Sequence, residues 1–236
     1  MFLPNNRKFY PSVFIERKNR FILTCKLADT NEPITVHLQD PGRLKELLIP
    51  ENLIYVSYHN DPQRKTKWTA ELITRPNSDV LISLRSTLPN QLIKLALQEK
   101  VLPDFSHLTF KRQEYTFGKS RWDFLLEGED LPYLLEVKSV TMAQNEIGYF
   151  PDAPTKRGKK HVEELIEIRQ QGTHSTGILF VCQREDIKRL QPADWIDPDF
   201  STVLRHAKEA GVDIKALSCK VSLKGITLEE QIPVQI

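Results

Sequence analysis

The first third of the chain is a series of short segments with strand character. Runs rich in β-branched and aromatic residues alternate there with Asp, Asn, Pro and Gly, a pattern typical of strands separated by tight turns. Several short strands within about 80 residues favour a small barrel, for which an OB-like fold is one candidate. The predicted strands are NRFILTCKL (19–27), ITVHL (34–38), LIYVSY (53–58) and KWTAELI (67–73).

One segment interrupts these strands. DPGRLKELL (40–48) begins with turn-forming residues, and Leu44, Leu47 and Leu48 then recur at helical spacing. We therefore expect a turn followed by a short helix at this point of the barrel.

The pattern changes at residue 84. Apolar residues at intervals of three and four predict helices there, and short apolar runs between them predict strands. Such an order is typical of a mixed sheet flanked by helices. We therefore expect an α+β protein of two domains, an OB-like barrel (1–83) and a helix-flanked mixed sheet (84–236). The predicted helices begin near residues 88, 158 and 201, and the predicted strands are 113–118, 121–127, 133–140, 176–183 and a closing strand after Gly211.

Composition restricts the class of protein. The 236 residues are 40% hydrophobic and 27% charged, with a net charge of +2, which is ordinary for a globular chain. The first residues lack the apolar region of a signal peptide, and no apolar run approaches the roughly 18 residues of a membrane span. We expect a cytoplasmic protein with no membrane partner. The wide spacing of Cys25, Cys182 and Cys219 predicts buried free thiols.

Two charges interrupt the strand predicted at 133–140. Because side chains alternate along a strand, Glu136 and Lys138 share one face of it. Asp123 lies on the preceding predicted strand. A five-residue loop at 128–132 would turn Asp123 away from Glu136, whereas an even-numbered loop or a bulge would place it opposite Glu136 or Lys138. The sequence leaves that register open.

These three residue types suit metal-assisted chemistry. Neighbouring carboxylates repel each other unless a cation lies between them, and Mg²⁺ prefers oxygen ligands of this kind. With Mg²⁺ or Mn²⁺ held by Asp123 and Glu136, a bound water could attack a phosphodiester, and Lys138 could orient that water or stabilise the developing charge. The alternative is a salt-bridged strand face in which Lys138 neutralises both carboxylates.

A basic segment follows the charged strand. PTKRGKKH (154–161) places cations at the start of a predicted helix, where the helix dipole favours negative charge. A bound phosphate would suit this arrangement. The alternative is a solvated face held by Lys159–Glu163 and Lys160–Glu164 pairs at i,i+4 spacing. The cations concerned are Lys156, Arg157, Lys159, Lys160 and His161.

Several of these motifs resemble one known family. SRWDFLLE, EVKSVTM and GYFPDAPTKRGKKHVEEL, with NRF, DPGRLKELL and LPNQLIKLAL upstream, are similar to the bacterial sugar fermentation stimulation protein A family along nearly the whole chain. The family's PNTGRL turn reads QDPGRL here, which keeps the glycine and arginine but lacks the asparagine. The resemblance implies an N-terminal OB-type domain and a C-terminal domain like the PD-(D/E)xK nucleases.

The resemblance also implies site residues. It places the first acidic position of the nuclease motif at Asp123, the second at Glu136 and the lysine at Lys138, with Glu114 as a candidate outer carboxylate. It further implies DNA binding with little sequence preference and a role in regulating sugar (maltose) utilisation genes.

Two functions therefore stand as hypotheses. The first is a DNA-binding protein acting on gene expression, whose barrel stacks bases on Trp68 or Tyr55; for Trp68 an ordinary core position is the alternative. The second is a Mg²⁺- or Mn²⁺-dependent nuclease. No helix-turn-helix or sugar-binding motif is evident, and the oligomeric state stays open, with a homodimer among the alternatives. The candidate DNA contacts are Lys156, Arg157, Lys159, Lys160, His161, Arg43, Lys67 and Trp68.

Overall fold

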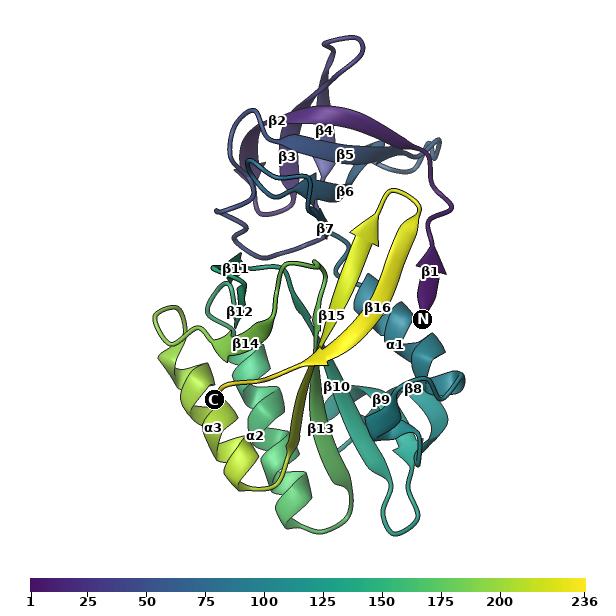
Figure 1. The fold of residues 1–236 in the computed structure, drawn as a ribbon, viewed down its shortest axis with the longest axis vertical. Helices are drawn as coiled ribbons and strands as arrows, with labels where there is room; N and C mark the ends of the chain where they lie inside the picture. Colours follow the sequence, from purple (N-terminus) through teal and green to yellow (C-terminus); the bar gives the residue numbers. More distant parts are fainter.

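A computed structural model describes residues 1–236 as two parts, a β-barrel and a helix-flanked sheet (Figure 1). The barrel strands follow the order β4-β3-β2-β5-β6, and pairing of β4 with β6 closes the ring, with β7 added beside β6. In β3, Leu23, Cys25 and Leu27 alternate into a core of 15 buried residues. The barrel strands are β2 (Phe9–Asn19), β3 (Ile22–Leu27), β4 (Pro33–His37), β5 (Leu53–Tyr58), β6 (Trp68–Thr74) and β7 (Leu81–Ser83).

The second part is built on a seven-stranded mixed sheet. Its order is β1-β16-β15-β13-β10-β9-β8, with β10, β13 and β15 parallel and the outer strands antiparallel. Helix α1 packs on one face of this sheet, and α2 and α3 pack on the other. The predicted α+β fold, an OB-like barrel followed by a helix-flanked mixed sheet, is confirmed.

The elements of this second part are as follows. The sheet strands are β1 (Phe2–Pro4), β8 (Thr109–Phe117), β9 (Ser120–Glu127), β10 (Tyr133–Val140), β13 (Ser175–Cys182), β15 (Asp213–Ser222) and β16 (Gly225–Ile232). The helices are α1 (Leu88–Gln98), the 3₁₀ turn η1 (Pro103–Phe105), α2 (Lys156–Gln170) and α3 (Pro198–Glu209). A small separate sheet holds β11 (Ala143–Gln144), β12 (Ile147–Phe150) and β14 (Arg189–Pro192).

The short helix predicted within 40–48 is wrong. This segment forms turns, and Leu44 has a φ of 50°, in the left-handed region that a right-handed helix does not use. Leu44 and Leu47 are nevertheless buried in the barrel core. The leucine spacing therefore reports burial against the barrel rather than a helix.

Strand β2 is the barrel's longest strand, and the sequence did not predict it. Its pairing with β3 shifts register between Phe14 and Glu16 and again between Arg17 and Asn19. Each shift interrupts the period-two alternation by which a strand is recognised. The other barrel strands lack such a double interruption and were predicted within a few residues, apart from the three-residue β7.

Two further properties concern the helices and the cysteines. No helix is both long enough and apolar enough to cross a membrane. Cys25, Cys182 and Cys219 are free and buried, which confirms the prediction for all three thiols.

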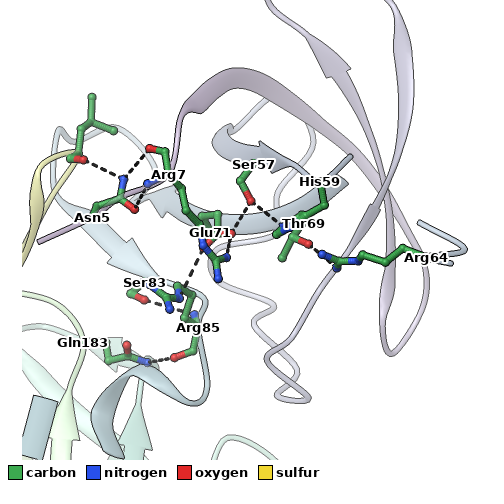
Figure 2. Close-up of polar contacts among 11 residues, drawn as sticks. Asn5, Arg7, Ser57, His59, Arg64, Thr69, Glu71, Ser83, Arg85 and Gln183 are labelled. Carbon is green, nitrogen blue, oxygen red and sulfur yellow. Dashed lines mark hydrogen bonds and ion pairs between the residues drawn. The ribbon is translucent and has the colours of Figure 1, made fainter. Parts of the chain in front are cut away.

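A buried glutamate joins the two parts (Figure 2). The Glu71 side chain on β6 is 0% exposed, and it forms an ion pair with Arg7, which lies between β1 and β2. Ser57 Oγ donates a hydrogen bond to Glu71 Oε1 at 2.5 Å, and Arg85 Nε lies 3.6 Å from Oε2. Arg7 follows a strand of the sheet and Arg85 precedes α1. One carboxylate therefore ties the barrel to both connections that leave it.

A glutamine continues this junction into the sheet. Gln183, at the end of β13, is 0% exposed and donates from Nε2 to the Arg85 carbonyl oxygen at 3.3 Å and to Ser139 Oγ at 2.8 Å. The backbone carbonyl of Gln183 accepts from the Ser83 backbone N–H at 3.2 Å. Gln183 thus connects Arg85, in the linker between the two parts, with Ser139 near the end of β10, the strand that carries Glu136.

We predict that Glu71→Ala lowers the free energy of unfolding by about 3 kcal/mol, because removing one partner of a buried ion pair leaves the other charge uncompensated. This is the low end of the usual range, since the arginines are partly exposed and can rehydrate. Urea denaturation measures the change. The exposed Glu32→Ala is the matched control and should stay within about 0.5 kcal/mol of the unmodified protein; equal losses in both variants would contradict the prediction.

Candidate functional site

The register of β9 and β10 brings two carboxylates together. Leu126 pairs with Tyr133 and Phe124 with Leu135. An even number of residues, 127–132, therefore lies between the paired residues Leu126 and Tyr133. The same register sets Asp123 opposite Glu136. Backbone pairing stops just before this point, and Asp123 Oδ2 instead accepts a hydrogen bond from the Val137 backbone N–H at 2.7 Å. The question that the sequence left open is settled in favour of convergence.

Glu136 is the best-shielded charge of the site. It is 5% exposed, and Lys138 Nζ donates to its Oε1 at 2.5 Å. His161 Nδ1 lies 2.8 Å from the same oxygen. Burial alone would raise the pKa of Glu136, but these two partners outweigh burial and hold its pKa below the usual range. The other oxygen, Oε2, is buried with no hydrogen-bond partner.

His161 on α2 is held in one tautomer by its neighbours. Its Nδ1 faces an acceptor-only carboxylate oxygen, so Nδ1 carries the proton, while Nε2 accepts from Arg157 Nε at 3.5 Å. The Trp122 ring, 5.5 Å from the imidazole between centroids, packs against it edge-on. His161 thus belongs to the carboxylate group and is buried, unlike its exposed neighbours Lys156 and Arg157.

Asp123 is anchored from the opposite side of the sheet. Asn90 Nδ2 on α1 donates to Asp123 Oδ1 at 2.5 Å. Burial raises the pKa of Asp123 to about 7, and the Glu136 carboxylate adds to this effect, against the Val137 hydrogen bond and Lys138. We call the group Asn90, Asp123, Glu136, Lys138 and His161 the carboxylate site.

The carboxylate site fits a divalent cation. One buried oxygen of Glu136, Oε2, has no partner, and the neighbouring Asp123 has a pKa raised by burial and by the Glu136 carboxylate, so a cation bound to both would relieve their repulsion. Two protein carboxylates match the way Mg²⁺ is usually held, with waters and substrate phosphates as its remaining ligands. No cluster of three or more His, Cys, Asp or Glu side chains in the structure could form an all-protein metal cage.

The basic segment divides into paired and unpaired cations. Helix α2 begins at Lys156, and Thr155 caps it by accepting from the Gly158 N–H at 3.0 Å. Lys159 lies 4.0 Å from Glu163 and Lys160 lies 3.3 Å from Glu164, as the i,i+4 spacing predicted. Lys159 also pairs with Asp199 on α3 at 3.0 Å. Lys156 and Arg157 are exposed and have no acidic partner.

Glu114 lies opposite Asp123 on β8 and lines a pocket with it, while its carboxylate forms an ion pair with Arg121 at 2.7 Å. The other predicted residues lie on the barrel, apart from the carboxylate site. Trp68 is half-buried on the barrel, between Tyr10 and Tyr58 at ring distances of 5.2 and 5.0 Å. Tyr55 is partly buried and packs toward the sheet's core, while Lys67 and Arg43 are exposed on the barrel.

The sequence analysis missed Asn90 and the pairing of His161 with Glu136. Neither carries a local signal, because Asn90 lies 33 positions from Asp123 along the chain and His161 lies 25 from Glu136. Only the packing of α1 and α2 on opposite faces of the sheet brings them to the carboxylates.

A second acidic group lies where the barrel meets the sheet. Asp40, 7% exposed, accepts from the Gly42 N–H at 2.8 Å. A Cβ added to Gly42 would lie 1.8 Å from Asp152 Oδ2, so a side chain at residue 42 of the QDPGRL turn would displace the Asp152 carboxylate of the PDAPT segment. Burial raises the pKa of Asp40 to about 6, with Asp152 and Glu46 adding to the effect and the Gly42 hydrogen bond and Arg17 opposing it.

Because of this raised pKa, we predict that the effect of Asp40 on the free energy of unfolding depends on pH. Between pH 4 and 7 the folded carboxyl binds protons more tightly than the unfolded one, so its contribution to stability is lost as pH rises through about 6. Replacing Asp40 by Asn removes this dependence. We expect the free energy of unfolding of Asp40→Asn, relative to the unmodified protein, to rise by up to about 3 kcal/mol from pH 4 to 7.

Urea denaturation at each pH measures this difference. The exposed Asp29→Asn is the matched control and should give a flat difference. A curve for Asp40→Asn that runs parallel to that of the unmodified protein would contradict the assignment of the raised pKa to Asp40.

Comparisons with known proteins agree with this architecture. The family model described as "Sugar fermentation stimulation protein RE domain" matches residues 87–225, and "SfsA N-terminal OB domain" matches residues 15–83. The chain is 43% identical over 223 residues to the sugar fermentation stimulation protein homolog of Shouchella clausii, covering 94% of this chain and 96% of that protein. The homolog of Clostridium kluyveri is 39% identical over 224 residues, covering 94% and 95%.

A solved structure gives the same result. SfsA of Pyrococcus furiosus, determined in complex with Ca²⁺, superposes with a TM-score of 0.88 at 25% identity, covering 99% of this chain and 98% of that one. Both family models and the full-length relatives cover the barrel and the sheet together. The chain belongs to the sugar fermentation stimulation protein family.

Proposed function

We propose that this protein binds DNA with little sequence preference, with the DNA backbone against the start of α2. The observation that carries the proposal is the pair of exposed cations without acidic partners, Lys156 and Arg157, at the amino end of a helix. Arg157 also contacts His161, which holds Glu136, so a phosphate bound there would lie close to the carboxylate site. Cations that contact phosphates give affinity without reading bases.

The family name supports a role in gene expression. Relatives at about 40% identity are called sugar fermentation stimulation protein homologs. DNA binding by the same fold is a direct route to regulating sugar (maltose) utilisation genes. We assign the whole chain to this role, as a barrel domain within residues 1–83 and a sheet domain of residues 84–236 to which β1 also contributes. Further candidate contacts are Lys159, Lys160, Arg43, Lys67 and Trp68.

We predict that Lys156→Ala combined with Arg157→Ala weakens DNA binding to the same extent for unrelated sequences. Affinity falls as salt rises, so log affinity plotted against log salt has a negative slope. Each lost phosphate contact should make that slope shallower by about 1. Fluorescence anisotropy with labelled duplexes of two unrelated sequences, over a salt series, measures both effects.

The matched control is Lys159→Ala combined with Lys160→Ala, which removes the same charge from cations already paired with carboxylates. It should change the slope less. Affinity that does not depend on salt, or a larger effect in the control, would count against phosphate binding at the start of α2.

A second candidate function is DNA cleavage with Mg²⁺ or Mn²⁺. The specific observation is the convergence of Asp123, Glu136 and Lys138, with one buried Glu136 oxygen left without a partner. A divalent cation held by Asp123 and Glu136 would supply a polarised water and neutralise charge on the phosphate. The Ca²⁺ complex of the Pyrococcus furiosus relative supports a divalent cation for this fold.

The chain's own residues would have distinct parts in such a reaction. Lys138 would orient the attacking water or stabilise the charge that develops on the phosphate. Asn90 and His161 are positioning residues, since each holds one of the two carboxylates by a hydrogen bond. Lys156 and Arg157 would bind the backbone on the side of α2.

We predict that Glu136→Gln abolishes both divalent-cation binding, measured by calorimetry with Mn²⁺, and any cleavage of single-stranded, flapped or branched DNA. Gln keeps the volume of the buried side chain but removes its charge, so circular dichroism should show a folded protein. Glu209→Gln, at an exposed position at the end of α3, is the control and should retain both properties. Mn²⁺ affinity equal to that of the unmodified protein in Glu136→Gln would refute the metal assignment.

A further inference from the structure

A pocket of about 240 Å³ lies between the barrel and the sheet. The QDPGRL turn of the barrel lines one side, and the end of β10 with the segment 149–155 lines the other. Figure 1 places β11 and β12 of the adjoining small sheet at the end of the lower part that faces the barrel. At this size the pocket lies below the roughly 300–1,000 Å³ of sites for drug-sized ligands. It suits one small planar group, and we call it the interdomain pocket.

A buried acceptor faces this pocket. Asp40 is 7% exposed and lines it, and its Oδ1 accepts from the Gly42 N–H. Its other oxygen, Oδ2, has no hydrogen-bond or ion-pair partner in the structure. Arg17, whose charge opposes the rise in the Asp40 pKa, donates instead to backbone carbonyls, to Gly42 O at 2.8 Å and Arg43 O at 2.7 Å. Asp40 therefore offers a free acceptor to a ligand with N–H donors.

An aromatic pair, half-buried Tyr149 and exposed Trp195, lies beside the pocket. Tyr149 on β12 lines it, and the Trp195 ring lies 4.7 Å from the Tyr149 ring between centroids, at an angle of 73°. Trp195 is 64% exposed, the highest value among the large apolar side chains that are exposed. The other two tryptophans are packed, since Trp122 is fully buried and Trp68 lies between two tyrosines. An exposed ring beside a pocket is the usual platform on which a nucleobase stacks.

The pocket is continuous with the carboxylate site along the chain. Ser139 and Val140, which line it, follow Lys138 directly on β10, and Thr155, which also lines it, precedes Lys156. A strand of DNA whose phosphate lies at Lys156 can thus present its neighbouring base to the pocket. A paired base cannot enter, because its donor edge is occupied by its partner.

We propose that the interdomain pocket receives one unpaired base of single-stranded DNA, with Asp40 accepting from its N–H groups and Trp195 with Tyr149 stacking on the adjacent base. Guanine fits best, because its N1–H and N2 amino group present two adjacent donors to a carboxylate, whereas thymine presents only N3–H. This gives a modest base preference at one position on top of sequence-tolerant backbone binding. The inference rests on the DNA-binding function proposed above and adds its substrate class.

Stacking is tested with Trp195→Ala. Anisotropy with a labelled 12-mer of thymidines carrying one central guanine should show a loss of roughly 5- to 150-fold, the range for one stacked base, with less than about a twofold change for a duplex. The single strand should also quench tryptophan fluorescence, and Trp195→Phe should abolish the quench while keeping a stacking ring. Val101→Ala, at an exposed apolar position on the α1 side, is the control.

Base recognition is tested with Asp40→Asn. Replacing the guanine of the 12-mer by hypoxanthine removes only the N2 amino group, and the unmodified protein should bind the hypoxanthine strand at least about fivefold more weakly. Asp40→Asn should remove that difference. Duplex binding with an unchanged single-strand affinity in Trp195→Ala, or equal affinity for guanine and hypoxanthine strands, overturns this inference alone. Absence of binding to both single strand and duplex overturns it together with the proposed function.

Discussion

The buried carboxylate of Glu71 fixes the relation between the barrel and the sheet. A charge with no exposed surface is stable only while its partners stay in place, and here the partners are arginines on the two connections that leave the barrel. Pairing of β1 with β16 adds a second tie, because the chain begins in the sheet before it crosses to the barrel. A barrel held at both of its connections has little freedom to rotate against the sheet.

That constraint sets the shape of the interdomain pocket. The QDPGRL turn packs closely against the PDAPT segment in this orientation, and a side chain at Gly42 would displace the Asp152 carboxylate. Gln183 then links the domain linker to Ser139, one residue beyond Lys138. A change in the orientation of the barrel would therefore move the interdomain pocket and the end of β10 together. The barrel therefore forms one side of the interdomain pocket.

How far the sequence predicted the structure depends on the range of the interactions involved. The strand 133–140 was predicted to the residue, because its apolar run is local, and the Glu136–Lys138 face followed from alternation alone. The convergence with Asp123 was left open, since it depends on loop parity, and the structure resolves it with an even loop. The helix at 40–48 failed because leucine spacing reports burial without reporting backbone conformation. Asn90 could not be found at all, because its role arises only when α1 packs on the sheet.

The carboxylate site shows why charges occur within a core strand. An isolated buried carboxylate would take up a proton, yet Lys138 and His161 keep the pKa of Glu136 low enough for it to stay ionised. Asp123 is left with the opposite tendency, because burial and the neighbouring Glu136 carboxylate raise its pKa. Two carboxylates with pKa values displaced in opposite directions, one of them with an unused oxygen, form an electrostatically incomplete group. A divalent cation would complete this group. Arg157, an unpaired cation at the start of α2, contacts His161 of the same group, so a phosphate bound to Arg157 would lie close to it.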